Sequence, residues 1–112
     1  MIFRRRILLA LLMFASSAQA DYQSGVITGY LTHRSGSTAI LIVKVDSGTT
    51  AGCNTTGRLA MASTDARYNA TFAAVVAAHS MQASVKVAYD TTCDNWSNSY
   101  DLSFVCVGDI SC

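Results

Sequence analysis

Two histidines, four cysteines and seven aspartates are the side chains of this 112-residue chain that could carry acid–base, nucleophilic or metal chemistry, and the chain has no glutamate. His33 stands in a polar turn, and His79 stands near the end of a predicted helix, where a positive charge complements the helix dipole. No nucleophile is placed to pair with either histidine, and the aspartates fall in loops or at the ends of elements. We therefore expect a protein that is not an enzyme.

The possible metal ligands do not have the spacing of a metal site. The polar loop 90–101 is rich in side-chain oxygens, but their spacing does not fit the EF-hand pattern, and a solvated loop is the simpler interpretation. A zinc site would need a C-x-x-C pair or suitably spaced histidines, and the sequence has neither. We expect no metal and no other cofactor.

Residues 1–20 have the three parts of a secretory signal peptide: three arginines, an apolar run from Ile7 to Ala15, and the A-x-A site Ala18-Gln19-Ala20. That run is too short to span a membrane, and no other stretch approaches the roughly 20 apolar residues that a span needs. Residues 21–112 are predicted to form one small domain that is secreted or periplasmic. This part carries five scattered basic residues against seven aspartates, so it lacks the basic stripe that nucleic acid requires.

All four cysteines lie in the exported part, and an even number in a small exported domain indicates two disulfides. Three connectivities are possible, and the sequence does not choose among them. We favour a short C-terminal loop closed by Cys106 and Cys112. This choice leaves Cys53 to pair with Cys93, which would tie the loop before the helix to the loop after the next strand.

Hydrophobic periodicity predicts strands at 24–31, 38–46, 58–62, 84–89 and 102–107, with one helix between the third and fourth strands. The run 38–46 is the most apolar and is predicted to be a central strand. This order in about 90 residues is typical of the OB-fold, a five-stranded Greek-key barrel with a helix between strands 3 and 4. An α+β sandwich could give the same order of elements.

The helix is expected to begin near Ser63 or Thr64, whose side chains could cap its first turn, with Asp65 at the positive end of the dipole. One face is predicted to be bulky and a second face to consist of alanines. The bulky face contains Tyr68, Phe72, Val75, Val76 and His79, and the alanine face contains Ala66, Ala70, Ala73, Ala74 and Ala77. A helix of this kind could be covered on both sides, although alanine is also simply the best helix former.

Four short stretches of the chain resemble the B subunits of subtilase cytotoxin and of pertussis-like AB5 toxins. The stretches are Ser24-Gly25-Val26-Ile27-Thr28, Tyr68-Asn69, Val85-Lys86-Val87-Ala88-Tyr89-Asp90, and Val107-Gly108 beside a close cysteine pair. The resemblance implies a small exported OB-fold protein that forms homopentamers, binds sialylated cell-surface glycans and delivers an A subunit encoded elsewhere. The chain departs from the family in its first bridge, because no cysteine near Ile40 matches the earlier one.

The resemblance also implies three glycan-binding residues. Ser24 matches the serine that contacts the sialic acid carboxylate, Tyr89 matches a tyrosine of the glycan pocket, and Lys44 matches a basic or polar pocket residue by its separation from Cys53. A sugar site needs hydroxyl or amide partners and an aromatic face, which Ser24, Tyr89 and Tyr22 could supply. Without the resemblance, Ser24 is interpreted as an edge residue and Tyr89 as a half-buried one.

Two features of the sequence stay open. Trp96, the only tryptophan, stands in the loop 90–101 and could either stack on a sugar or a partner, or pack back over the sheet.

The alternative to a glycan-binding toxin subunit is a periplasmic protein-binding module, such as an inhibitor or an immunity protein. That alternative predicts a monomer or dimer that binds one protein and ignores sugars.

Overall fold

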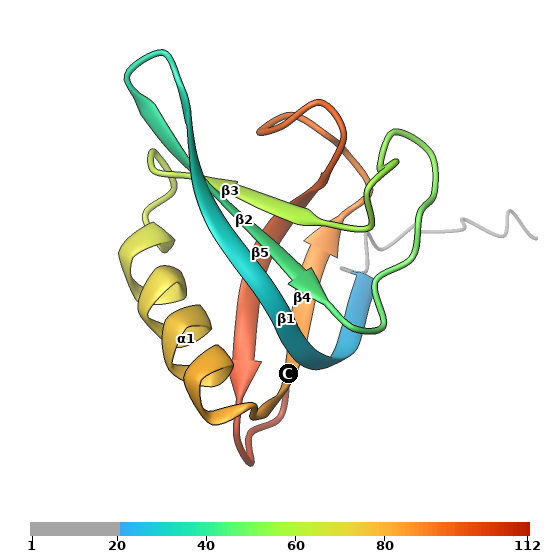
Figure 1. The fold of residues 1–112 in the computed structure, drawn as a ribbon, viewed down its shortest axis with the longest axis vertical. Coiled ribbons are helices and arrows are strands. Elements are labelled where there is room, and N and C mark those ends of the chain that lie inside the picture. Colours follow the sequence, from blue (N-terminus) through green and yellow to red (C-terminus); the bar gives the residue numbers. More distant parts are fainter. Residues whose placement is uncertain (1–20) are drawn as a thin grey trace, which may run out of the picture.

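The computed structural model describes residues 21–112, which form a mainly β domain with one helix (Figure 1). The elements are β1 (Asp21–Ser35), β2 (Thr38–Val45), β3 (Leu59–Ala62), α1 (Tyr68–Met81), β4 (Ser84–Asp90) and β5 (Tyr100–Val107). The predicted order of strands and helix is confirmed. The predicted signal peptide, residues 1–20, lies outside the described residues.

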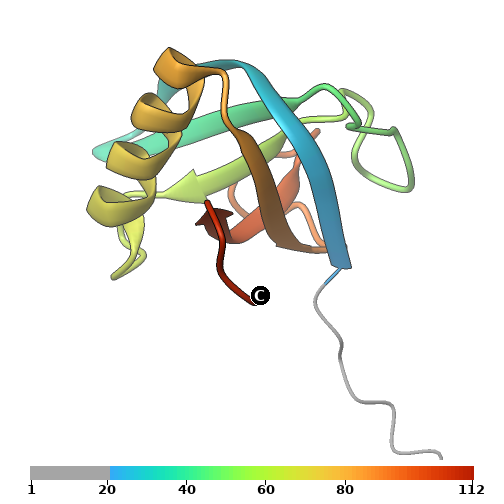
Figure 2. The ribbon, with the colours of Figure 1, turned by 90° about the horizontal axis from the view of Figure 1, so that it is seen from below.

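The five strands form one sheet that closes in a ring in the order β1-β2-β3-β5-β4. The long strand β1 closes the ring because it changes partner along its length. Residues 21–26 pair with β4, and the part from Ile27 to Ser35 pairs with β2, with an irregularity between Ile27 and Gly29. Figure 2 shows the first half of β1 beside β4. All pairings are antiparallel except the short one between β3 and β5.

The sheet has buried residues on both faces of β2, which explains why that strand is apolar throughout. Alternate residues Leu41, Val43 and Val45 point into the ring with Ile27 and the other members of the main core. Ile40 and Ile42 point outward, yet they are also buried, in a second cluster with Ala60 that Trp96 packs against. The prediction of a central strand at this place is therefore confirmed.

The helix α1 begins later than the sequence predicted. Its first residue is Tyr68, the residue before it is Arg67, and no side chain caps it. The predicted cap at Ser63 or Thr64 is wrong because these residues form a turn, in which the Asp65 carboxylate accepts the backbone N–H of Arg67 at 2.8 Å. The chain must complete this turn after β3 before the helix can start.

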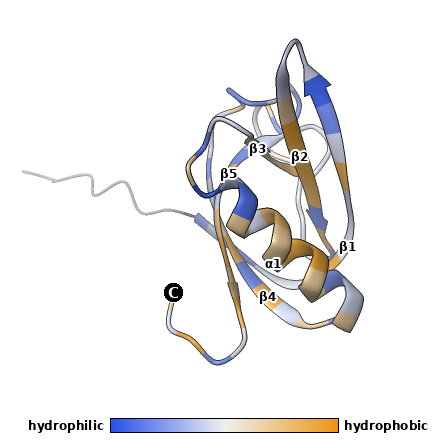
Figure 3. Ribbon diagram, turned by 90° about the vertical axis from the view of Figure 1, so that its left-hand side faces the viewer, coloured by the Kyte–Doolittle hydropathy of each residue, from blue (hydrophilic) through white to orange (hydrophobic). Residues whose placement is uncertain are grey.

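The buried stripe of α1 is also rotated from the predicted bulky face. Thr71, Val75 and Ala78 are buried, whereas Tyr68, Phe72 and the remaining bulky residues are half-buried. Phe72 and His79 contact the ring of Tyr30 on β1, with centroid distances of 6.2 and 5.4 Å. The small residues thus let the helix approach the open end of the sheet, and the larger ones fill the space beside β1. Figure 3 shows α1 along this side, with the β1–β2 hairpin extending beyond it.

Two disulfides close the domain. Cys53 is bonded to Cys93, and Cys106 is bonded to Cys112, so the favoured pairing is confirmed. The first bridge joins the β2–β3 loop to the β4–β5 loop, and the second holds the C-terminal segment against β5. Within residues 21–112 no helix is long and apolar enough to cross a membrane.

Candidate functional site

Ser24 lies on the outer face of the first half of β1, where its side chain is exposed. Its backbone is fixed from the β2–β3 side. The Ser47 hydroxyl donates to the Ser24 carbonyl at 2.6 Å, and the Asp46 carboxylate accepts the Val26 N–H at 3.1 Å. Glycine at position 25 makes this approach possible, since a side chain there would overlap the Asp46 carboxylate. These bonds hold the Ser24 main chain and leave its hydroxyl available.

Lys86 on β4 is the register partner of Ser24, and Tyr22 is the next outward-facing residue on β1. The Lys86 ammonium stands 4.6 Å from the centre of the Tyr22 ring, which is 39% exposed. The Tyr22 ring meets Phe104 edge-on at 6.1 Å, and its hydroxyl donates to the Cys112 carbonyl at 3.3 Å. We call Tyr22, Ser24 and Lys86 the Ser24 patch. It places a hydroxyl, an ammonium group and an aromatic ring side by side.

Tyr89 is not part of the Ser24 patch. Its ring is half-buried and stacks on Tyr100 at a centroid distance of 5.6 Å, with the two planes within 9°. Tyr100 belongs to the main core, so Tyr89 packs toward the core rather than toward the outer face of the sheet. In register, Tyr89 faces Asp21 at the beginning of β1, whereas Ser24 faces Lys86.

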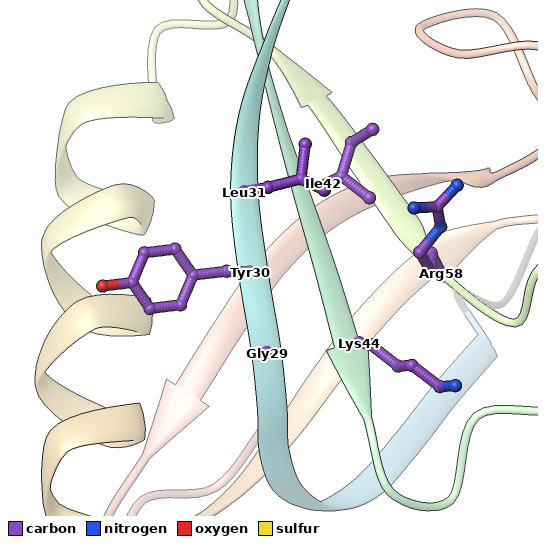
Figure 4. A pocket seen from close by; sticks show the side chains of 6 residues that line it. All are labelled: Gly29, Tyr30, Leu31, Ile42, Lys44 and Arg58. Atoms are coloured by element: carbon purple, nitrogen blue, oxygen red, sulfur yellow. The ribbon is translucent and has the colours of Figure 1, made fainter.

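Lys44 lies in a shallow pocket on the outer face of β1 and β2, opposite Gly29 (Figure 4). The pocket has a volume of about 240 Å³, and Arg58, the residue before β3, is its second cationic residue. The remaining lining residues are Gly29, Tyr30, Leu31 and Ile42. In Figure 4 the Tyr30 ring points away from this face toward α1. We call this site the Lys44 pocket.

Trp96 packs back over the sheet, which decides between the two orientations that the sequence left open. It lies against the cluster of Ile40, Ile42 and Ala60, and its ring is 4.4 Å from that of His33 with a tilt of 32°. Trp96 covers part of the outer face of β2 and β3 and does not project from the loop to contact a sugar or a partner.

The loop that carries Trp96 is organised by Asp101, a carboxylate that is only 9% exposed. It accepts the Thr92 hydroxyl at 2.5 Å, the Asp94 N–H at 3.0 Å and the Asn95 N–H at 2.9 Å. Three donors spread over four residues of the loop thus converge on one side chain of β5. We expect the loop conformation to depend on this buried carboxyl group.

Most charged side chains of the domain are not paired with one another. The one ion pair within residues 21–112 joins Arg67 to Asp65 at 3.3 Å. The backbone N–H and the side chain of Arg67 donate to the Asp65 carboxylate and hold its pKa below the usual value, more than its slight burial raises it. No group of three or more His, Cys, Asp or Glu residues in this part of the chain could hold a metal ion.

Sequence reasoning named Ser24, Tyr22 and Lys44 but missed their cationic neighbours. Lys86 lies in the predicted strand 84–89, but its place opposite Ser24 is set by the pairing of β1 with β4. Arg58 comes into the Lys44 pocket only because β3 pairs with β2. Neither strand pairing can be predicted from the local sequence.

No protein-family model, curated protein or solved structure matches this chain.

Proposed function

We propose that residues 21–112 form an exported OB-fold domain that binds sialylated glycans, in the manner of an AB5 toxin B subunit. Three features support the architecture: the ring order β1-β2-β3-β5-β4, the partner change along β1, and the position of α1 between β3 and β4. Two disulfides in a domain of this size are typical of exported proteins.

The observation that carries the proposal is the pairing of Ser24 with Lys86 beside Tyr22. A sialic acid has a carboxylate, several hydroxyls and one apolar face. The Lys86 ammonium and the Ser24 hydroxyl can both donate to the carboxylate, and a hydrogen bond to an ionised group is about twice as strong as a neutral one. The exposed Tyr22 ring gives the apolar face of the sugar a surface on which to pack.

Tyr89 has a different role in this proposal from the one that the resemblance implied. Because its ring stacks on Tyr100 and packs toward the core, it supports β4, the strand that carries Lys86. It is a positioning residue, and the sugar contacts Tyr22, Ser24 and Lys86. Lys44 belongs to a separate pocket and is not needed for this contact.

A glycan microarray probed with the oxidised protein, residues 21–112, tests this function. We expect signals on sialylated glycans that weaken about tenfold or more in Ser24→Ala and in Lys86→Gln, the loss expected from removing a charge-assisted hydrogen bond. Arg34→Gln is the matched control, since it removes one exposed positive charge from the β1 hairpin far from the patch. The proposal fails if no sialylated glycan is bound, or if both patch variants bind as the unsubstituted protein does.

The assembly follows from the same proposal. A single shallow site binds a sugar weakly, and several copies on one surface multiply the avidity. We propose a homopentamer that delivers an A subunit encoded elsewhere, with the exposed alanines of α1 facing neighbouring copies. Native mass spectrometry measures the number of subunits directly, and a monomer at micromolar concentration would contradict the pentamer.

A second candidate function, a periplasmic protein-binding module, is favoured by a cleft between the β1–β2 hairpin and the start of α1. The cleft has a volume of about 410 Å³ and is lined by Thr32, Ala39, Tyr68, Asn69 and Phe72. Aromatic rings beside an open hairpin are a surface on which another protein could pack. This candidate is supported if the protein binds no glycan on the array and is a monomer or dimer.

A further inference from the structure

The Lys44 pocket is separate from the Ser24 patch. Lys44 faces Gly29, and Ser24 precedes Gly29 by five positions, which corresponds to about 16 Å of extended strand. Between them β1 changes its partner from β4 to β2. The two sites therefore lie on different parts of β1, and each has its own set of side chains.

The pocket gathers positive charge that the protein does not neutralise. Lys44 and Arg58 are two of only five basic residues in a domain with seven aspartates, yet the lining of the pocket contains no carboxylate. Neither residue forms an ion pair within the described part of the chain. Two cationic side chains that line one pocket without a carboxylate favour the binding of an anion there.

Arg58 also has a hydrogen-bond donor that lacks a partner. Its backbone N–H donates to the Thr56 hydroxyl at 3.3 Å, but its side-chain Nε is buried without any partner in the described structure. Buried donors in proteins are almost always satisfied, by protein, by water or by a ligand. Because this Nε is shielded from solvent, the Arg58 side chain has to turn before an oxygen atom of a ligand in the pocket can supply the missing partner.

We propose that the Lys44 pocket is a second binding site, specific for an anionic group of a ligand: a carboxylate, a sulfate or a phosphate monoester. The Arg58 guanidinium offers a planar fork that matches two oxygens of such a group, and the Lys44 ammonium adds a point charge. Ile42 and Leu31, the latter 39% exposed, provide an apolar floor for the atoms that carry the charge. The volume of about 240 Å³ is below the usual range for a whole ligand and suits one charged group with part of one ring.

The proposal stands independently of glycan binding at the Ser24 patch. Each of the three anions presents at least two oxygens to the Arg58 fork: a carboxylate has two, and a sulfate or a phosphate has three. The anions differ in charge and in the molecule that carries them. The test therefore uses one probe for each source: 3′-sialyllactose for a carboxylate, a sulfated heparin disaccharide for a sulfate, and inorganic phosphate for a phosphate.

Each probe is titrated into ¹⁵N-labelled protein, residues 21–112 with both disulfides formed, and the backbone amide signals of Gly29, Lys44 and Arg58 are followed. We expect saturable shifts of these signals with at least one probe, and the probe that binds most tightly identifies the source. Lys44→Gln, a substitution at an exposed side chain, is expected to keep the fold and to weaken this binding about tenfold. Arg58→Lys keeps the charge but loses the fork, so it is expected to weaken binding as well.

Two control variants distinguish binding at the pocket from a general effect of positive charge and from binding at the Ser24 patch. Arg34→Gln removes an exposed positive charge elsewhere and should leave the dissociation constant unchanged. Lys86→Gln should abolish the signal shifts at the Ser24 patch and leave those at the Lys44 pocket. The absence of binding at one site can then be recognised whether or not the other site binds. The proposal is overturned if none of the three probes shifts the pocket signals saturably, or if Lys44→Gln and Arg58→Lys both bind as tightly as Arg34→Gln.

Discussion

Replacing Asp101 tests whether one buried carboxylate organises the β4–β5 loop. Asp101→Ala removes the acceptor for three donors, from Thr92, Asp94 and Asn95. Asp101→Asn is the finer change. Its amide oxygen can still accept the Asp94 and Asn95 N–H groups, and its amide nitrogen can donate to the Thr92 hydroxyl. The first variant removes the hydrogen bonds, and the second removes mainly their charge.

The magnitude follows from the number and type of these bonds. A hydrogen bond to a charged group contributes about 1.5–3 kcal/mol, but the two loop N–H groups can be rehydrated when the loop opens. We therefore expect Asp101→Ala to lower the free energy of unfolding by about 3 kcal/mol and Asp101→Asn to lower it by about 1 kcal/mol. In a domain of this size, the larger loss lowers Tm by more than about 10 °C.

Trp96 reports on this change because it is the only tryptophan and stands in the affected loop. Urea denaturation followed by tryptophan fluorescence gives the free energy, and the emission of the folded state shows whether Trp96 still packs on Ile40 and Ile42. Asp109→Asn, an exposed substitution in the C-terminal turn, is the matched control and should change stability by less than about 0.5 kcal/mol. The reasoning is refuted if Asp101→Ala is no less stable than this control and its emission is unchanged.

Three further predictions concern the bridges, the helix start and β4. Replacing both Cys53 and Cys93 by alanine should lower the free energy of unfolding in urea by about 4 kcal/mol. Removing the C-terminal bridge should lower it by only about 2 kcal/mol, because that bridge closes a shorter loop. Equal losses would contradict this dependence on loop length. The pKa of Asp65 is lowered in the folded state, so its contribution to stability is present at neutral pH and is lost as the pH falls below 3.8 through that lowered value. The difference in unfolding free energy between the protein and Asp65→Asn should therefore shrink in acid. A difference that grows in acid would contradict this prediction. Tyr89→Phe should bind glycans normally because the ring stack on β4 remains, whereas a loss of binding as large as that of Ser24→Ala would make the Tyr89 hydroxyl a direct contact.

Much of this architecture could be predicted from the sequence because the patterns behind it are local. The period-two alternation in β4 and the fully apolar β2 both mark strands, and the spacing of the last two cysteines favours a short closed loop. The start of α1 could not be predicted, since Thr64 and Asp65 have the composition of a cap but the path of the chain after β3 uses them in a turn. At this place the geometry of the connection between β3 and α1 outweighs the local preference of these residues for a helix start.

The candidate sites depend on contacts that are distant in sequence. Ser24 and Lys86 are brought together by the pairing of β1 with β4, and Lys44 and Arg58 by the pairing of β2 with β3. A one-residue change of register would turn each of these side chains to the other face of the sheet. The sequence could therefore suggest residue types for a binding site, while the groups that act together required the structure.

The most direct test of the glycan-binding function is a titration of 3′-sialyllactose into ¹⁵N-labelled protein, residues 21–112, followed at the backbone amides of Ser24 and Lys86. We predict saturable shifts of both signals that disappear in Lys86→Gln and persist in Arg34→Gln. Unchanged signals at millimolar sugar, or equal shifts in the two variants, would contradict the assignment of the Ser24 patch as the glycan site.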